Sequence, residues 1–296
     1  LAQANSKRSP SSGSLPPPIA GGQRAARSFS ALAEMQRQVS DYTHGVRTQH
    51  DGSTPPDRAL AKLREGNERF TTGRAEKTKN FKAEHREALA THGQLPMAAI
   101  LGCADSRAPI EIVFDVQPGD LFVLRNAGNT LSHAEGSVVG SLEYCVGPLK
   151  AKLIVVLGHT KCGAMMGATQ TMLAAQQAAQ GAAAPGKSAL EKLLAGLGPV
   201  TEQAQYELNA NGGSATAEEI AAHVVKVNVL AGMERLLIYS EPIREKVRSG
   251  EVQLHGAVYD ITTGKVEFLG QHPRLPLILG MQAGLINTDK SLEAIV

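Results

Sequence analysis

Three residues of the types that bind zinc occur in two short stretches of this chain, LGCADSRAP and GHTKCG. The first stretch contains Cys103, and the second contains His159 and Cys162, three residues apart. Two thiolates and one imidazole form a good ligand set for zinc and leave a fourth tetrahedral position open, as in catalytic rather than structural zinc sites. The spacing alone is weak evidence, because buried cysteines are common core residues.

A charged pair follows the first of these cysteines. Asp105 and Arg107 alternate with Cys103 along the chain. A carboxylate that accepts a hydrogen bond from a zinc-bound oxygen would orient a hydroxide. A neighbouring arginine would keep that carboxylate ionised and turned away from the metal. The alternative is a local ion pair that caps a turn, and the adjacent cysteine favours the catalytic interpretation.

The third cysteine has no partner motif. Cys145 lies in LEYCVG, inside a predicted helix, and we expect it in the core. Three cysteines, an odd number in a chain of 296 residues, do not form a disulfide framework and suit a reducing compartment.

The elements around these residues alternate between strand and helix. Apolar runs predict strands over 97–102, 121–124 and 153–158. A helix is expected over 137–149, ended by Gly147 and Pro148. A second helix is expected to begin in KCGAMMGATQTML. The stretches LHGAVYD and KVEFLG, joined by ITTG, predict a hairpin. The fold class is therefore α/β, a mostly parallel central sheet with an antiparallel edge hairpin, flanked by helices.

This arrangement places the zinc-type residues at one edge of the sheet. Cys103 follows the first strand and His159 the third, and open α/β sheets build their sites at the carboxyl ends of parallel strands. The spacing of His159 and Cys162 predicts that both lie on one face of a starting helical turn.

Two further helices are predicted on either side of this region. The folded region is expected to start near TPPDRALAKLREGNERF, where Leu60, Leu63 and Phe70 share a helix face. A long helix over 216–237 begins with a capping pattern, Thr216 followed by Glu219. Within the Ala/Gln-rich segment 170–215, the stretch AAQQAAQGAAAPG is expected to be a helix end followed by a loop, and the segment carries no recognisable chemistry.

Composition limits the classes of partner. Hydrophobic residues make up 42% of the chain, which allows a sizeable core, and the net charge of +2 gives no reason to expect nucleic-acid binding. No apolar run approaches the roughly 18 residues that span a bilayer.

The N-terminal segment differs from the rest. Residues 1–33 contain no acidic residue, four basic residues and seven serines, which is the composition of an organellar transit peptide. We expect a mitochondrial location ahead of a chloroplast location. The alternatives are an unstructured tail or an ordered arm that grips a partner subunit.

Taken together, the motifs CADSR, RNAGN (125–129) and GHTKCG, in this order, resemble the β-class carbonic anhydrases of the plant-like type. The resemblance runs from about Leu60 to Gly270. It implies a zinc lyase that reversibly hydrates carbon dioxide to bicarbonate and a proton, with one zinc per subunit. It also implies a homodimer or a higher even oligomer whose pockets take residues from two chains. The expected division is 1–50 as a targeting-like or arm segment, 51–270 as the catalytic domain and 271–296 as a C-terminal extension.

The resemblance assigns roles by position. Cys103, His159 and Cys162 match the zinc ligands. Asp105 and Arg107 match the dyad that orients the zinc hydroxide for its attack on carbon dioxide.

Five other positions match the family's substrate pocket. Gln94 matches a substrate-binding glutamine, and Phe122 and Tyr144 match aromatic residues that line the carbon dioxide pocket. Ala127 stands where a valine is usual, and Gly163 follows the last ligand as the family pattern requires.

Two positions depart from relatives. Pro148 stands where some plant-like members have a histidine suggested to pass protons, which leaves the proton exit route open. Ile100 stands where bicarbonate-inhibited bacterial members have a tryptophan, so we expect that inhibitory pocket to be missing.

Two rival functions fit the same residues. Hydrolysis of carbonyl sulfide or carbon disulfide would use the same zinc hydroxide chemistry on the same fold. It would differ from carbon dioxide hydration only in which substrate can enter the pocket. A non-catalytic zinc scaffold subunit would keep the fold without turnover, but it would have no need for an open zinc position or for the Asp105–Arg107 pair.

Overall fold

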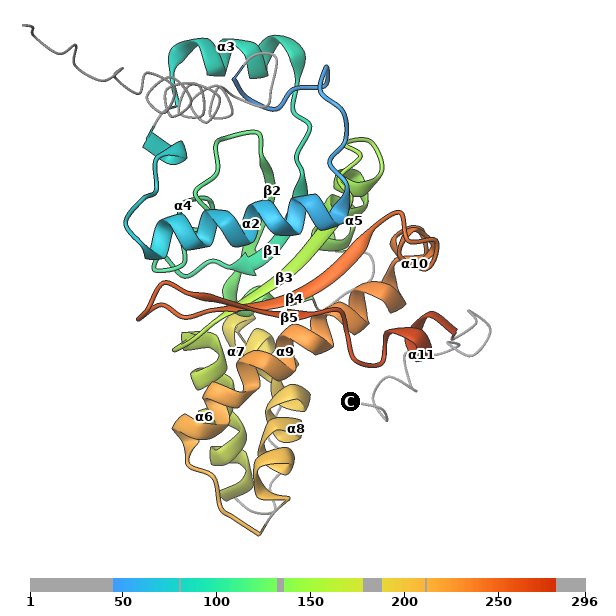
Figure 1. Ribbon diagram of the computed structural model, residues 1–296. Coiled ribbons are helices and arrows are strands. Elements are labelled where there is room, and N and C mark those ends of the chain that lie inside the picture. Colours follow the sequence, from blue (N-terminus) through green and yellow to red (C-terminus); the bar gives the residue numbers. More distant parts are fainter. Residues whose placement is uncertain (1–44, 80, 132–135, 178–187, 211, 281–296) are drawn as a thin grey trace, which may run out of the picture. The chain divides into compact units, whose positions relative to one another are not determined.

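The computed structural model describes residues 45–79, 81–131, 136–177, 188–210 and 212–280 (Figure 1). Their centre is a five-stranded sheet in the order β2-β1-β3-β4-β5. The first four strands in this order are parallel and β5 pairs antiparallel with β4, which confirms the predicted fold class. The strands are β1 (Ala98–Cys103), β2 (Leu121–Asn126), β3 (Leu153–His159), β4 (Gln253–Tyr259) and β5 (Val266–Gly270).

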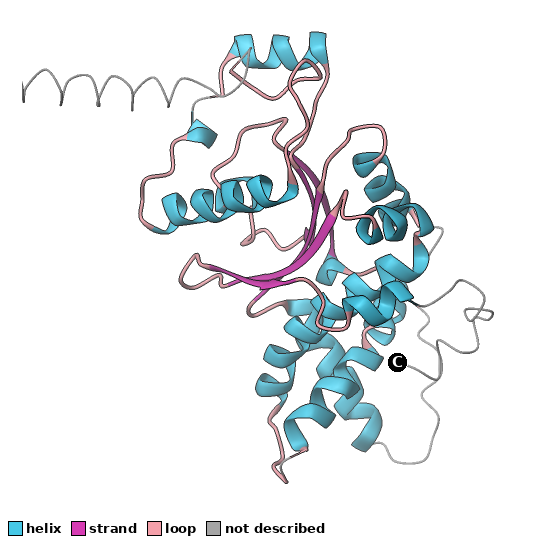
Figure 2. Ribbon diagram, turned by 45° about the vertical axis from the view of Figure 1, so that its right-hand side comes forward, coloured by secondary structure: helices cyan, strands magenta, loops and turns pink. Residues whose placement is uncertain are grey.

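Helices occupy most of the remaining described chain and lie on both faces of the sheet (Figure 2). Before β3 they are α2 (Pro56–Thr71), η1 (Lys77–Lys79), α3 (Ala83–His92), α4 (Ile110–Val113), η2 (Ala127–Asn129) and α5 (Ser137–Val146). After β3 they are α6 (Gly163–Gln177), α7 (Ala189–Gly196), α8 (Gly198–Asn209), α9 (Ala217–Tyr239), α10 (Glu241–Arg248) and α11 (Leu275–Gly280). None of these described helices has the length and apolar character needed to cross a membrane.

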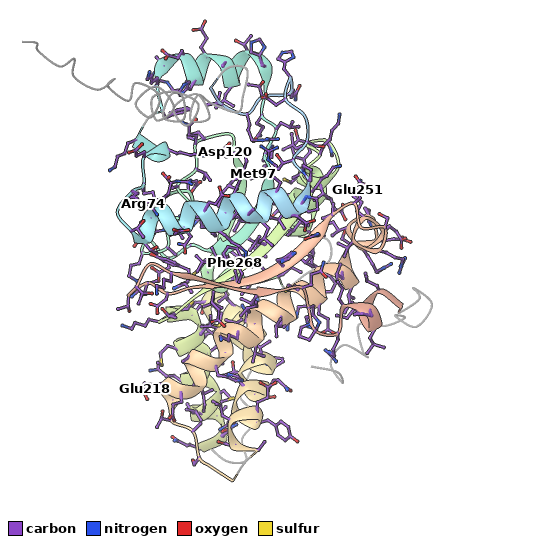
Figure 3. The ribbon with its side chains drawn as sticks, viewed as in Figure 1. Arg74, Met97, Asp120, Glu218, Glu251 and Phe268 are labelled. Carbon is purple, nitrogen blue, oxygen red and sulfur yellow. The ribbon has the colours of Figure 1, made fainter. Side chains whose placement is uncertain are left out.

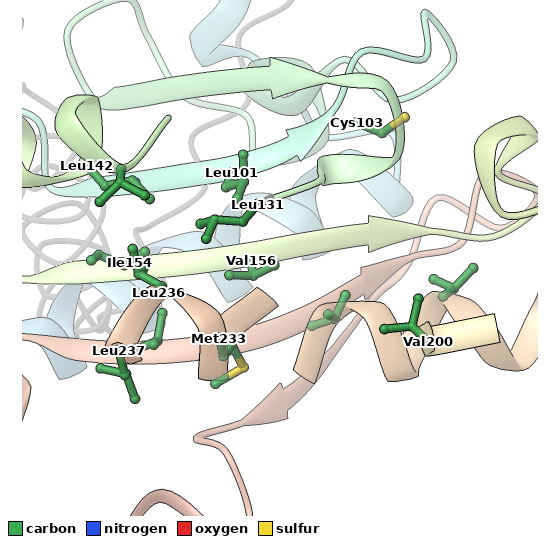
Figure 4. Packing of buried hydrophobic residues seen from close by; sticks show 14 of the residues in the cluster. Leu101, Cys103, Leu131, Leu142, Ile154, Val156, Val200, Met233, Leu236 and Leu237 are labelled. Atoms are coloured by element: carbon green, nitrogen blue, oxygen red, sulfur yellow. The ribbon is translucent and has the colours of Figure 1, made fainter. Parts of the chain in front are cut away.

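Both faces of the sheet are buried, as expected for parallel strands covered by helices. Along β1, Ile100 faces a cluster that contains Leu63 of α2, whereas its neighbour Leu101 faces the cluster of α9. In that second cluster, Val156 and Met233 lie between the sheet and α9 (Figure 4). Alternate side chains of one strand therefore fill two separate apolar layers.

Helix α9 packs unusually close to the strand that ends at the site. A β-carbon at Gly158 would lie 2.9 Å from methyl groups of both Val225 and Val229. At Gly256 on β4, a β-carbon would lie 2.8 Å from Val229. Two glycines on neighbouring strands thus let α9 approach the sheet beside His159. The predicted cap of this helix is confirmed, since the Glu219 N–H donates to Thr216 Oγ1 at 3.2 Å.

The structure confirms the predicted ends of two helices. The helix expected to stop at Gly147 and Pro148 runs from Ser137 to Val146, with Gly147 as its C-cap. Helix α6 ends at Gln177, inside the stretch AAQQAAQGAAAPG where a helix end was expected, and the loop predicted after it falls on residues 178–187, outside the described residues. Beyond it lie α7 and α8, which were not predicted from the sequence; Ser188 caps α7 by accepting the Glu191 N–H at 3.1 Å.

Residues shortly before α2 pack onto the rest of the described chain. Val46, Arg47 and Thr48 are buried before Thr54 is reached. Arg47 Nε donates to the Leu95 carbonyl at 2.7 Å, so this segment is bonded to the loop that leads into β1. The predictions for residues 1–44 and 281–296 lie outside the described residues.

A backbone hydrogen bond links the residues just before β1 and β2. The Met97 N–H, just before β1, donates to the Asp120 carbonyl, just before β2, at 2.8 Å (Figure 3). Six residue pairs then keep β1 and β2 in parallel register, ending with Cys103 opposite Asn126. This register brings Cys103 beside the RNAGN segment.

Candidate metal centre

The three zinc-type residues meet at the carboxyl ends of two neighbouring parallel strands. Cys103 is the last residue of β1, His159 is the last residue of β3, and Cys162 immediately precedes α6. Their ligand atoms all lie within 4.8 Å of one another, and the two sulfurs are 4.0 Å apart. Two sulfurs bound tetrahedrally to one zinc at about 2.3 Å would be about 3.8 Å apart, so the group fits a single zinc ion.

The turn between the second and third ligands differs from the prediction. His159 and Cys162 do not share a helical turn, because β3 continues through His159, whose register partner is Tyr259. The chain then turns through Lys161, which adopts a left-handed conformation with φ of 55°, and α6 starts only at Gly163. Strand pairing therefore fixes His159, and the strained turn returns Cys162 toward it.

The histidine has a buried nitrogen suited to a metal. His159 Nδ1 lies 2.9 Å from the Thr160 carbonyl, so it carries the proton and leaves the Nε2 lone pair available. Among the described residues, no group hydrogen-bonds this buried Nε2. A buried polar atom without a partner is costly, and a zinc ion between the ligands would satisfy it.

Binding of a cation would favour the deprotonated form of both sulfurs. Backbone N–H groups of Asp105 and Gly128 donate to Cys103 Sγ at 3.4 Å and 3.3 Å. The hydrogen bond from Cys162 lowers the pKa of Cys103 to about 3, and the same contact raises the pKa of Cys162. Without a cation between them, two sulfurs this close do not both ionise. A divalent ion removes that conflict.

The predicted charged pair is formed and faces the metal group. Arg107 binds Asp105 at two points, Nε to Oδ1 at 3.0 Å and Nη2 to Oδ2 at 2.7 Å. These bonds hold the pKa of the Asp105 carboxyl well below its usual range. Oδ2 also lies 3.8 Å from His159 Nε2, so the carboxylate stands beside the ligands while Arg107 holds it. Arg107 itself is anchored to the Lys161 carbonyl at 3.0 Å.

Sequence reasoning missed two residues that support this group. Arg125 Nε donates to the Cys103 carbonyl at 2.9 Å, and its Nη2 donates to the Asp105 carbonyl at 2.6 Å. Asn228 on α9 donates to the Gly128 carbonyl at 3.0 Å, behind the Gly128 N–H that reaches Cys103. The available signals were the place of Arg125 in RNAGN and the occurrence of a lone asparagine in the apolar run HVVKVNVL.

The remaining predicted residues lie on different elements, and within this chain they do not all reach the metal group. Phe122 pairs with Ala99, and Gln94 precedes β1, so both lie toward the amino ends of the strands, whereas Cys103 lies at the carboxyl end. Phe122 on β2 and Tyr144 on α5 have ring centroids 6.2 Å apart, and Tyr144 is 50% exposed. Ala127 is exposed at the start of η2, and a β-carbon on Gly163 would meet open space. Gln94 is partly buried on a separate loop, between α3 and β1. Cys145 lies in the core as predicted, and burial raises the pKa of its thiol to about 12.

Comparison with known proteins identifies one family. The pattern that defines the carbonic anhydrase family matches residues 98–266. "Carbonic anhydrase 2" of Mycobacterium tuberculosis is 35% identical over 216 residues, which are 72% of this chain and 92% of the relative. Two relatives from Arabidopsis thaliana, "Beta carbonic anhydrase 5, chloroplastic" and "Beta carbonic anhydrase 6, mitochondrial", are 31% and 27% identical over 60% and 62% of this chain, and over 55% and 60% of their own lengths.

Solved structures agree with this result. The β-carbonic anhydrase CafA of Aspergillus fumigatus has a TM-score of 0.52 and 28% identity, covering 75% of this chain and 96% of its own. A β-carbonic anhydrase of Sordaria macrospora, described as tetrameric, has a TM-score of 0.52 and 30% identity, covering 72% of this chain and 96% of its own.

Proposed function

This chain belongs to the β-class carbonic anhydrase family, and we propose that Cys103, His159 and Cys162 hold its catalytic zinc, with Asp105 and Arg107 completing the reaction centre. The activity of the family is the zinc-dependent, reversible hydration of carbon dioxide to bicarbonate and a proton. When bound, zinc supplies Lewis-acid chemistry, which makes a nucleophile available from water near neutral pH. The proposal rests on the convergence of two buried sulfurs and a buried imidazole nitrogen within 4.8 Å.

The role we assign to Asp105 is to orient the attacking water. Its Oδ2 accepts a hydrogen bond from that water and leaves the oxygen lone pair directed at carbon dioxide. The carboxylate does this only when it is ionised, and the two bonds from Arg107 keep it so. The same bonds hold Asp105 back from the open metal position, which a free carboxylate would otherwise fill.

The role of Arg125 is to position the other residues. Its guanidinium spans the carbonyls of Cys103 and Asp105, so the metal ligand and the orienting carboxylate move as one unit. Such support is worth about 10- to 100-fold in activity at metal centres.

For substrate, we propose an apolar pocket lined by Phe122 and Tyr144, with Ala127 and Gly163 at its rim and Gln94 donating to an oxygen of the substrate. Carbon dioxide is apolar and small, and the aromatic pair offers a water-poor surface. Because Phe122 pairs with Ala99 near the amino end of β1, the pair would reach this pocket from a second subunit. The half-exposed Tyr144 supports a pocket that a second subunit completes. We therefore propose a homodimer as the minimal unit, with a tetramer as described for the Sordaria relative as the larger option.

Stopped-flow hydration of carbon dioxide, measured with zinc content on the same sample, tests the function. We expect turnover in proportion to bound zinc. Hydrolysis of carbonyl sulfide with no hydration of carbon dioxide would instead identify the rival hydrolase. Full zinc content with neither reaction between pH 7 and 9 would identify a scaffold.

We propose further that residues 1–50 direct the chain to an organelle, with the mitochondrion ahead of the chloroplast, that 51–270 form the catalytic domain and that 271–296 form an extension. The acid-free, basic and serine-rich composition of 1–33 supports the targeting role. Relatives named for both organelles exist in Arabidopsis thaliana. A fusion of residues 1–50 to a fluorescent reporter tests this role, and a diffuse cytosolic signal would contradict it.

A further inference from the structure

We propose that His50 and His92 form a second metal site, separate from the zinc centre, that binds a divalent transition-metal ion such as Ni²⁺, Cu²⁺ or Zn²⁺. His50 belongs to the segment before α2, and His92 is the last residue of α3. His50 Nε2 and His92 Nδ1 lie 3.1 Å apart.

This separation fits two ligands of one ion. Imidazole nitrogens bind zinc at about 2.0–2.1 Å, and an angle of about 100° at the metal places two such nitrogens about 3.1–3.2 Å apart. The two rings meet edge to face, with centroids 4.7 Å apart and planes inclined by 68°. The centroids are thus closer than about 5.4 Å, the separation if both nitrogens pointed straight at each other, so the two ring axes meet at an angle, which is compatible with a shared third atom.

The backbone holds both histidines in this arrangement. The Gln49 N–H, one residue before His50, donates to the His92 carbonyl at 3.2 Å. On the other side of His50, the Asp51 carboxylate accepts the Thr48 N–H at 2.8 Å, which closes a tight turn. Because a hydrogen bond already joins the two segments, ion binding would cost little conformational entropy for bringing the rings together.

The chemistry of the pair sets the class of ion. Both donors are imidazole nitrogens, and no sulfur takes part, so the site suits nickel, copper or zinc rather than magnesium or calcium. His50 is exposed and His92 partly buried, so the pair lies near the surface of the described chain. The rival explanation is a hydrogen bond between two neutral rings, with no affinity for metal.

A bound ion would clamp the segment around His50 to the end of α3. The next residues, Gly93 and Gln94, lead into β1. A β-carbon on Gly93 would lie 2.9 Å from the side-chain nitrogen Nε2 of Gln49. The clamp would therefore tighten a contact next to the loop of Gln94. The inference shares no residue with the zinc centre and does not depend on the proposed function.

Nickel titration of the full chain, zinc-loaded and without a histidine tag, tests the site. Isothermal titration calorimetry should give one equivalent of Ni²⁺ beyond the resident zinc. The absorption spectrum should lack the sulfur-to-nickel charge-transfer band that replacement of zinc at the thiolates would produce. His50→Gln and His92→Gln should each weaken nickel binding at least tenfold, because one of two ligands is lost.

A matched variant separates this site from other histidines. His223 is a half-buried histidine that contacts Glu207 at 2.6 Å, and His223→Gln should leave the nickel affinity unchanged. Circular dichroism and zinc content establish that all three variants are folded. The proposal is overturned if wild-type protein takes up no nickel beyond the zinc site, or if His50→Gln and His92→Gln bind it as tightly as wild type.

Discussion

At the scale of single residues, the Asp105–Arg107 pair decides whether a bound zinc could act in catalysis. The same carboxylate can orient a water molecule or occupy the metal's open position, and the difference between these outcomes lies in the two bonds from Arg107. The pair is 2.7 Å apart at its shortest contact, although the Arg107 side chain is 52% exposed. Its value is therefore geometric rather than a contribution to stability.

Removing either member of the pair should abolish most activity by different routes. Arg107→Ala should keep zinc and reduce kcat/KM by about 10- to 100-fold, because Asp105 becomes free to bind the metal. Asp105→Asn should also keep zinc and lose activity, with the fourth position left open to added anions. Spectra of the cobalt-substituted variants distinguish the two, since only Arg107→Ala gains a carboxylate ligand. Near wild-type turnover by Arg107→Ala would reduce the pair to a structural turn.

Arg125 should behave as a positioning residue. Arg125→Gln removes the two bonds to the Cys103 and Asp105 carbonyls and should lower kcat by about tenfold or more. Arg125→Lys should restore little, because an ammonium group cannot span both carbonyls as the planar fork does. The cobalt spectrum of Arg125→Gln should shift as the ligand geometry relaxes. A loss of thermal stability with unchanged kcat and spectrum would contradict this role.

At the scale of elements, the contact between α9 and the sheet decides how rigidly His159 is held. The close approach depends on glycine at the penultimate position of β3, next to Val225 and Val229. The same helix carries Asn228, which is bonded to the Gly128 carbonyl. One helix therefore supports both the strand of the histidine and the loop that donates to Cys103.

Filling the gap under α9 should disturb the metal centre from a distance. Gly158→Ala places a methyl group 2.9 Å from two buried valine side chains, and overpacking of this kind costs about 1–3 kcal/mol of unfolding free energy. We also expect weaker zinc retention against a chelator, since the strain moves His159. Gly196→Ala, where a β-carbon meets open space, is the control and should change neither quantity. Equal zinc retention by the two variants would show that α9 does not position the ligand.

At the scale of the whole molecule, buried histidines outside the metal centre link stability to pH. His255 and His272 are buried, and burial lowers the pKa of each below its usual value near 6.5. The unfolded chain therefore binds more protons than the folded chain as the pH falls below about 6.5. The stability that these neutral rings provide is present above that pH and is lost progressively below it.

Urea unfolding between pH 5.5 and 8 measures this effect. The unfolding free energy should rise with pH up to about 6.5–7 and then level, and His255→Gln with His272→Gln should flatten the rise. Excess zinc is kept throughout, because protonation of His159 would otherwise release the metal and mimic the trend. A slope that is unchanged in the double variant would assign the pH dependence to other groups.

The sequence by itself determined the parts of this protein that depend on local order along the chain. Alternating apolar runs set the strands, a capping pattern set the start of α9, and the positions of Cys103 and His159 after two parallel strands placed them at one edge. The tertiary structure alone decided which groups from distant segments complete the centre. Arg125 contacts Asp105, 20 residues earlier in the chain, and Asn228 contacts Gly128, 100 residues earlier. Contacts of that range leave no periodic trace in sequence, because they depend on strand register and helix packing rather than on neighbouring residues.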